Sequence, residues 1–159
     1  MKITMCPPKY FGVNYEINPW MSVKNQPDKT LAQKQWNDVK NIFENLGIKV
    51  DVIEAKDGLP DMVFTANAGL PVDDKFILSN FTHPERVGEI KHFKDFFSKK
   101  FQIIELPENV KFEGQGDAFF AEDKLFLGSG FRSSKSAKEE IKKHLPAGIK
   151  VVQLELINP

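Results

Sequence analysis

The sequence predicts an α/β fold built from repeated strand–strand–helix–strand units. Residues 73 to 78 read DDKFIL and residues 122 to 127 read EDKLFL, so an acidic turn precedes a short apolar strand in both places. A polar loop with an arginine follows each strand, SNFTHPER in the first segment and GSGFR in the second. Lys75 and Lys124, which occupy the same place in the two segments, lie about 50 residues apart, a spacing found in repeat architectures.

The remaining elements follow each arginine loop in the same order. The runs VGEIKHFKDFF and SAKEEIKKHL place apolar residues three and four positions apart, which predicts amphipathic helices. Strand-like segments come next, FQIIEL at 101 to 106 and IKVVQLEL at 149 to 156. Because these features recur in order, a repeat is favoured over a plain α/β domain whose halves match by accident.

An earlier segment fits the same plan more loosely. The helical run LAQKQWNDVKNIFENLG ends at Gly47, a residue typical of helix C-termini, and leads into the strand-like IKVDVIEA. We therefore expect one partial domain of three units, residues 1–56, 57–106 and 107–159. Units of this kind do not bury their apolar faces alone, so an array or a closed ring is expected.

Composition indicates a soluble globular protein and argues against several classes of partner. The 159 residues are 41% hydrophobic and 28% charged, and 22 basic residues balance 22 acidic ones. This balance argues against a nucleic-acid partner or a membrane surface. The sequence has no run of about 18 apolar residues and no apolar leader segment, which predicts a cytoplasmic protein.

Metal and cofactor chemistry is not predicted. The single cysteine, Cys6, excludes an internal disulfide and a cysteine-rich zinc site, and a lone cysteine is typically a buried small apolar residue. The histidines His83, His92 and His144 share no metal-ligand spacing. We expect no metal and no cofactor.

Polar side chains gather instead in the loops beside the strands. Asn18 lies in INPW, Asp61 and Asn67 lie in LPDMVFTANAGLP, and Glu113 and Asp117 lie in KFEGQGDAFF. The MVFT run between the prolines of the second segment is expected to be a strand. Equivalent loops converge on one axis in a ring of repeats, so these side chains are candidates for one binding site.

The chemistry of this set suits a small cationic or zwitterionic ligand. A buried carboxylate such as Glu113 requires a cationic partner, and carboxylates accept paired hydrogen bonds from a planar guanidinium. Arg86 and Arg132 are expected to hold the carboxylate end of an amino acid.

The same residues have structural alternatives. Glu113 and Asp117 are alternatively turn residues whose side chains cap backbone amides, and Asp61 is alternatively a turn or cap residue. Arg86 alternatively begins a helix and pairs with Glu89, three positions later.

Five motifs, taken in order, resemble those of a known enzyme superfamily. They are INPWM, PDMVFTANAGL, HPERVGE, FEGQGDA and GSGFRS. The combination is similar to the amidinotransferase and arginine-dihydrolase branch of the guanidino-group-modifying enzymes, which include arginine deiminases and dimethylarginine dimethylaminohydrolases. The resemblance implies the pentein fold, an α/β-propeller of five ββαβ units, of which about three lie in this chain.

The resemblance also implies a chemistry and two catalytic residues. In the superfamily a cysteine thiolate attacks the guanidinium carbon to form a covalent thiouronium, a histidine moves protons, and water or an amine completes the reaction. Glu113 matches the glutamate that binds the guanidinium. Asp117 is the second acid of that motif and is expected to orient the loop or the histidine.

The substrate-binding set implied by the resemblance comes from the other motifs. Asn67 stands where other branches place an aspartate, and together with Asn18 it resembles the arginine-dihydrolase type. Arg86 and Arg132 match the arginines that hold the substrate carboxylate. The full set is Asn18, Asp61, Phe64, Asn67, Arg86 and Arg132.

Two catalytic residues of the superfamily have no match in this chain. Its histidine lies in a His-Leu-Asp segment after the third unit and its cysteine lies near the end of a longer chain, whereas Cys6 lies near the start of this one. We therefore expect the substrate-binding portion of an arginine-type hydrolase or amidinotransferase, completed by a complementary C-terminal half or by self-association. The alternatives are a non-catalytic binder of arginine-like ligands and a pentein-fold interaction module.

Overall fold

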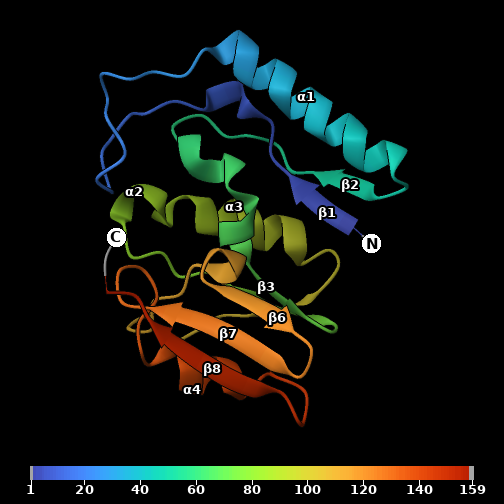
Figure 1. Ribbon diagram of the computed structural model, residues 1–159, viewed down its shortest axis with the longest axis vertical. Coiled ribbons are helices and arrows are strands. Elements are labelled where there is room, and N and C mark those ends of the chain that lie inside the picture. Colours follow the sequence, from blue (N-terminus) through green and yellow to red (C-terminus); the bar gives the residue numbers. More distant parts are fainter. Residues whose placement is uncertain (1, 158–159) are drawn as a thin grey trace. The chain divides into compact units, whose positions relative to one another are not determined.

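The computed structural model describes residues 2–157 and divides the chain into two compact units. The first unit ends at Thr65 and the second begins at Ala66. Figure 1 shows that both contain strands and helices, so the α/β class predicted from the sequence is confirmed. The unit boundaries expected near residues 56 and 106 stay predictions.

The first unit is a parallel pair of strands joined by a long helix. Its elements are β1 (Lys2–Met5), η1 (Pro8–Tyr10), α1 (Lys29–Asn45), β2 (Lys49–Val52) and the 3-10 turn η2 (Pro60–Val63). The Asp28 side chain accepts a hydrogen bond from the Leu31 amide N–H at 2.9 Å, which caps the start of α1. Beyond the end of α1, Gly47 has a φ of 74°, the left-handed conformation typical of helix termination.

The MVFT run forms helical turns, and the expectation of a strand is wrong. It contributes to η2 and to the start of a second 3-10 turn, η3 (Thr65–Ala68). Pro60 fixes φ at the start of η2, and the Thr65 hydroxyl donates to the Thr4 carbonyl at 2.8 Å. Met62 is buried without strand pairing. Apolar and β-branched residues favour half-buried surfaces more than a particular backbone, so their presence alone did not determine a strand.

The second unit holds two three-stranded sheets of the same topology. Their strands are β3 (Gly69–Val72), β4 (Lys75–Leu78) and β5 (Gln102–Ile104) in the first sheet, and β6 (Ala118–Ala121), β7 (Lys124–Ser129) and β8 (Lys150–Glu155) in the second. In each sheet the first two strands form an antiparallel hairpin and the third runs parallel to the second. The hairpins turn at Asp73 and Glu122, each with a φ of 52°. The acidic residues that recur in DDKFIL and EDKLFL therefore form the same hairpin turn in both sheets.

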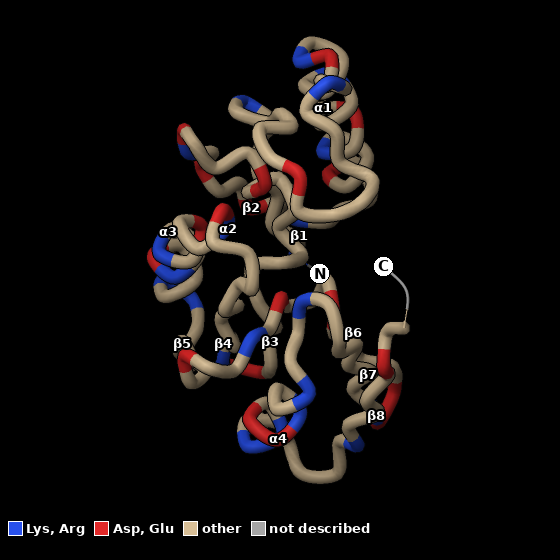
Figure 2. The backbone as a smooth tube through the Cα atoms, turned by 90° about the vertical axis from the view of Figure 1, so that its left-hand side faces the viewer, with Lys and Arg blue, Asp and Glu red and all other residues tan. Residues whose placement is uncertain are grey.

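Helices connect the second strand of each sheet to the third. They are α2 (Pro84–Val87) and α3 (Glu89–Phe97) in the first sheet and α4 (Ala137–Lys142) in the second. Phe76 on β4 stacks against Phe97 on α3 with ring centroids 3.9 Å apart, so α3 covers one face of its own sheet. Figure 2 shows charges of both signs along α3 and α4, as expected of amphipathic helices. No helix in the described part of the chain is long and apolar enough to cross a lipid bilayer.

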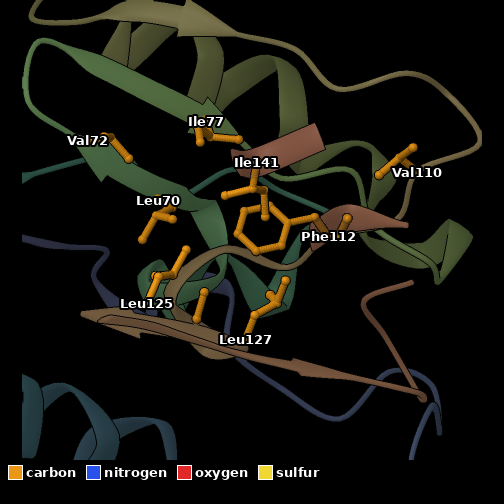
Figure 3. Packing of buried hydrophobic residues seen from close by; sticks show 10 residues of the cluster. Leu70, Val72, Ile77, Val110, Phe112, Leu125, Leu127 and Ile141 are labelled. Carbon is orange, nitrogen blue, oxygen red and sulfur yellow. The ribbon is translucent and has the colours of Figure 1, made fainter. Parts of the chain in front are cut away.

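The core of the second unit joins its two sheets. Leu70 and Ile77 of the first sheet and Leu125 and Leu127 of the second are fully buried in one cluster. Figure 3 shows these side chains directed toward one another, with Ile141 of α4 among them. Burying each such side chain contributes about 1.5–3 kcal/mol relative to leaving it exposed. This core fixes the loops at the ends of the strands, where the predicted polar residues lie.

Candidate functional site

Two glycines shape the FEGQGD loop. The loop forms a single turn, η4 (Gly114–Gly116), directly before β6. Gly114 has a φ of 60°, and a Cβ atom there would lie 2.6 Å from the Gly69 amide nitrogen. A Cβ atom at Gly116 would collide with the Asn67 side chain. Glycine alone permits this close approach of two loops, which carries Glu113 into the interior.

Gly114→Ala is expected to lower the free energy of unfolding by about 2–5 kcal/mol, because alanine meets both a left-handed backbone and the backbone of Gly69. Gly58 is a matched control, since its φ is 75° and nothing lies within 4 Å of its Cβ position. Gly58→Ala carries only the backbone cost of about 1–2 kcal/mol. Urea unfolding measures both variants, and equal losses would contradict the proposed collision.

The Glu113 carboxylate is buried beside two arginines. The residue is 1% exposed, and its Oε2 lies 3.8 Å from Arg86 Nη1 and 3.7 Å from Arg132 Nε. These ion pairs are longer than hydrogen bonds. Within residues 2–157, no group forms a hydrogen bond with Oε1. A buried carboxylate oxygen without a donor is costly, so an additional N–H donor would stabilise the site.

Burial raises the pKa of Glu113 above its ordinary value, because desolvation disfavours the charged carboxylate. The positive charges of Arg132 and Arg86 oppose this rise without cancelling it, and the Asp117 carboxylate adds to it. A backbone hydrogen bond from Thr82 to the carboxylate also opposes the rise, and it is the smallest of these contributions to the pKa. Glu113 therefore holds its proton more tightly than a glutamate in water.

Glu89, Phe81 and Asn67 hold the Arg86 side chain in place. Its Nε and Nη2 donate to the two carboxylate oxygens of Glu89, both at 2.9 Å, which forms a bidentate pair. Its guanidinium carbon lies 4.4 Å from the ring centre of Phe81, and Nη1 donates to Asn67 Oδ1 at 3.2 Å. The pair with Glu89 is the structural alternative that the sequence offered for Arg86. Its contact with a substrate carboxylate stays a prediction.

Asp117 links the FEGQGD loop to the loop that follows β7. Arg132 Nη2 pairs with Asp117 Oδ1 and donates to the Gly116 carbonyl oxygen at 3.2 Å. The Ser133 hydroxyl donates to Asp117 Oδ2 at 2.6 Å and accepts from the Glu113 amide N–H at 3.1 Å. The Asp117 side chain is 3% exposed, whereas the Arg132 side chain is 38% exposed. Arg132 therefore contacts the buried Asp117 while part of its own side chain remains exposed to solvent.

Asn67 connects the loops of the two sheets. Its Nδ2 donates to the Glu113 carbonyl oxygen at 3.1 Å, while its Oδ1 accepts from Arg86. Each half of the amide thus has a partner that fixes its orientation. The second unit brings together five of the predicted site residues: Asn67, Arg86, Glu113, Asp117 and Arg132.

The cluster carries an excess of acid. The carboxylates of Glu89, Glu113 and Asp117 face the guanidinium groups of Arg86 and Arg132. When all five groups are charged, the set has a net negative charge of one. A monovalent cation that donates several hydrogen bonds would complement both this charge and the Oε1 atom of Glu113.

Three predicted residues belong to the first unit. Asn18 is exposed, and its Oδ1 accepts from the amide N–H groups two and three residues later, both at 3.1 Å. Asp61 is buried in η2. Phe64 is half-exposed and packs edge-on against Phe11, with ring centroids 6.1 Å apart. Substrate contacts of all three stay predictions.

Two supporting side chains were not singled out from the sequence. Ser133 is buried between Asp117 and the Glu113 amide, and Phe81 lies beneath Arg86. A serine in GSGFRSS carries no periodic signal, and Phe81 is one of 14 phenylalanines. Phe81 lies three residues after β4 and Ser133 lies four residues after β7, so both belong to the loops that follow the recurring strands.

Cys6 is buried, as lone cysteines typically are. In the part of the chain that the structure describes, no group of three or more His, Cys, Asp or Glu side chains is arranged to bind a metal ion. The functional groups in the described part of the site are therefore carboxylates, guanidinium groups, an amide and a hydroxyl.

Comparison with known proteins identifies the family. The model of the family described as N,N dimethylarginine dimethylhydrolase, eukaryotic, matches residues 7–158. The chain belongs to this family. Dimethylarginine dimethylaminohydrolases are guanidino-modifying enzymes, so the superfamily predicted from the sequence motifs is confirmed.

Curated members and relatives of the family are longer than this chain. The N(G),N(G)-dimethylarginine dimethylaminohydrolase of Mycobacterium tuberculosis is 39% identical over 158 residues, which are 99% of this chain and 51% of that enzyme. The bifunctional arginine dihydrolase/ornithine cyclodeaminase ArgZ of Synechocystis is 41% identical over 162 residues, covering 99% of this chain and 23% of that protein. The chain thus spans about half, or less, of the length of these relatives.

A solved structure supports the assignment of the fold. The crystal structure of the N-terminal domain of cyanobacterial ArgZ, in a cysteine-to-serine variant bound to substrate, matches with a TM-score of 0.91 at 40% identity. The match covers 99% of this chain and 58% of that domain. The chain therefore has the α/β fold of this pentein family, as the sequence predicts. The number of propeller units stays a prediction.

Proposed function

We propose that the chain is the substrate-binding portion of an arginine-type guanidino-modifying enzyme, a hydrolase or amidinotransferase that acts through a covalent cysteine–thiouronium intermediate. One observation carries the proposal. The buried Glu113 carboxylate has an oxygen without a donor and lies in a cluster with excess acid. A guanidinium supplies both the missing positive charge and planar N–H donors that match a carboxylate.

The proposed roles follow from the contacts of each side chain. Glu113 binds the substrate guanidinium, and Asp117 orients the FEGQGD loop through its bonds to Ser133 and Arg132. Arg132 is the arginine most accessible to a substrate carboxylate. Asn67 holds the Glu113 backbone and Arg86 supplies positive charge beside its carboxylate. In the proposal, Asn18, Asp61 and Phe64 complete the substrate-binding set.

Relatives with bound ligands favour arginine or a related guanidino compound. The ArgZ domain has been crystallised with substrate, and a variant of AgrE has been crystallised with L-arginine. ArgZ and AgrE are bifunctional arginine dihydrolases. The cysteine nucleophile and the histidine that moves protons are proposed to come from the part of the family's length that this chain does not span.

The other expectations from the sequence are part of the same proposal. The chain is a single partial pentein domain with about three of five propeller units, divided near residues 56 and 106. It works in the cytoplasm and is completed by a complementary C-terminal half or by self-association. Covalent cysteine chemistry on a guanidinium needs no metal or cofactor.

Calorimetric titration of the chain with L-arginine tests the proposal. Saturable binding is expected for L-arginine and not for L-norleucine, which lacks the guanidinium and keeps the amino-acid end. Equal binding of the two ligands, or binding of neither, would contradict a guanidinium site. Release of ornithine or citrulline from arginine, measured after the complementary portion is added, separates an enzyme portion from a non-catalytic binder.

Arginine binding is expected to release a proton from Glu113. Burial raises the pKa of the free carboxyl, and a bound guanidinium favours its charged form, so the pKa falls on binding. Affinity should therefore rise with pH through the raised pKa of the free chain and then level off. Folding has the opposite sign: Glu113 favours the folded state most at low pH, and this contribution is lost as the pH rises.

Titrations in two buffers of different ionisation enthalpy measure the released proton. The proton release should approach one per arginine on the acidic side of the transition and vanish well above it. A pH-independent affinity together with no proton release would show that Glu113 does not face the ligand's charge.

A further inference from the structure

We propose that Ser133 is a positioning residue that couples the two ends of the proposed substrate site. In the proposed function, on which this inference rests, Glu113 binds the guanidinium of the ligand and Arg132 holds its carboxylate. The Ser133 hydroxyl lies between the groups that place these two side chains. Its removal is therefore expected to disturb a ligand that uses both ends more than a ligand that uses the guanidinium end alone.

The backbone of Glu113 is held by side chains instead of by a helix or a sheet. Glu113 directly precedes η4, with a φ of −120° and a ψ of 45°. Its amide N–H donates to Ser133 Oγ at 3.1 Å, and its carbonyl oxygen accepts from Asn67 Nδ2 at 3.1 Å. The ion pairs of its carboxylate with the two arginines are longer than hydrogen bonds. The backbone position therefore determines much of where the carboxylate lies.

The two hydrogen bonds of the Ser133 hydroxyl reinforce each other. The hydroxyl has one proton to donate, and Asp117 Oδ2 accepts it at 2.6 Å. This leaves the lone pairs of Oγ for the amide N–H of Glu113. Donation to a negative carboxylate makes the hydroxyl oxygen a stronger acceptor, so the bond from Glu113 depends on Asp117. Because Ser133 is 2% exposed, bulk water has little access to either bond.

Asp117 connects this pair of bonds to Arg132. Its other oxygen, Oδ1, pairs with Arg132 Nη2, so the carboxylate is held from two sides. Without the Ser133 hydroxyl, Oδ2 loses a donor in a buried place, and the carboxylate is expected to rotate. The Arg132 carbonyl oxygen accepts separately from the Thr82 hydroxyl at 2.6 Å. The disturbance should therefore reach the guanidinium of Arg132 more than the backbone of its loop.

Two ligands separate the two ends of the site. L-Arginine carries a guanidinium and a carboxylate, whereas agmatine carries the same guanidinium without the carboxylate. Calorimetric titration of the full chain with each ligand compares the wild type with Ser133→Ala. The substitution should weaken L-arginine binding about tenfold and agmatine binding about threefold. A general loosening of the fold would weaken both by the same factor, so the ratio of the two losses measures the coupling.

Ser134→Ala is the matched control, because it removes the same group from the next residue. Ser134 Oγ accepts from the Lys111 amide N–H at 3.1 Å, which is the same kind of bond to a different part of the backbone. This variant should bind both ligands as the wild type does. Ser133→Cys supplies a weaker donor of similar size, so its losses should fall between those of the wild type and Ser133→Ala. It provides the same comparison if circular dichroism shows that the alanine variant is unfolded.

Hydrogen exchange of the Glu113 amide in the ligand-free chain gives a second readout. Ser133→Ala should speed this exchange at least about tenfold, and Ser134→Ala should leave it unchanged. A Glu113 amide that exchanges at the wild-type rate in Ser133→Ala overturns the inference.

The binding results distinguish this inference from the proposed function. If the wild type binds L-arginine and Ser133→Ala weakens both ligands equally or neither ligand, the coupling is overturned and the guanidinium site stands. If the wild type binds neither ligand, the proposed function fails and the inference fails with it.

Discussion

Arg86→Leu is expected to lower the free energy of unfolding by about 3–5 kcal/mol. The Glu89 carboxylate is fully buried and receives two hydrogen bonds from Arg86, so the substitution leaves a buried charge without its guanidinium. Glu113 loses a nearby positive charge in the same step. Urea unfolding monitored by circular dichroism measures the loss.

Lys143→Leu provides a control of the same helical spacing. Lys143 and Glu140 also lie three residues apart, but the Lys143 side chain is 60% exposed. Exposed pairs contribute little, so this variant should unfold at nearly the urea concentration of the wild type. The double variant Arg86→Leu with Glu89→Leu should recover part of the loss, because it removes both charges. A double variant less stable than Arg86→Leu alone would contradict this account.

Glu113→Gln is expected to weaken L-arginine binding by about 10–100-fold, the contribution of a hydrogen bond to a charged group. Glutamine keeps the shape of the side chain and removes the negative charge that a guanidinium requires. The raised pKa shows that the fold disfavours this charge, so the variant should be no less stable than the wild type at neutral pH. A loss of binding would therefore not reflect unfolding.

Calorimetry with L-arginine measures the effect, and Glu108→Gln is the matched control. Glu108 lies in an exposed turn of the same unit, so its substitution changes the net charge equally. If the two variants bound L-arginine alike, only the total charge would matter and Glu113 would not contact the guanidinium.

Local sequence signals predicted the elements that depend on local chemistry. The turns at Asp73 and Glu122 were visible because an acidic pair followed by a lysine and a short apolar run recurs in the sequence. The helical runs were visible through their apolar period. The MVFT run was wrongly expected to be a strand, because its apolar residues serve burial in a turn that Pro60 begins.

The sequence predicted those residues of the candidate site that lie in recognisable motifs, and it did not predict the others. Asn67, Glu113 and Asp117 stood out as polar residues in apolar surroundings, and the structure places them in one cluster. Ser133 was missed because its contact with Asp117 depends on how two loops meet in space. The spacing of residues along the chain does not predict a contact between two loops of this kind. The bidentate pair of Arg86 and Glu89 was visible, since three residues separate neighbours on a helix.

The hydrogen bond from Asn67 to the Glu113 carbonyl oxygen forms only after the loops of the two sheets have come together during folding. Asn67 precedes the first sheet and Arg86 lies on α2 between two of its strands, while Glu113 and Asp117 precede the second sheet, so the proposed site is complete only when both sheets are present. A ligand held by both sets recognises only chains in which the second sheet has joined the first. Such a ligand shifts the folding equilibrium by mass action, in proportion to the logarithm of its concentration above its dissociation constant. Bound ligand would then raise the fraction of chains in which the two sheets are correctly joined.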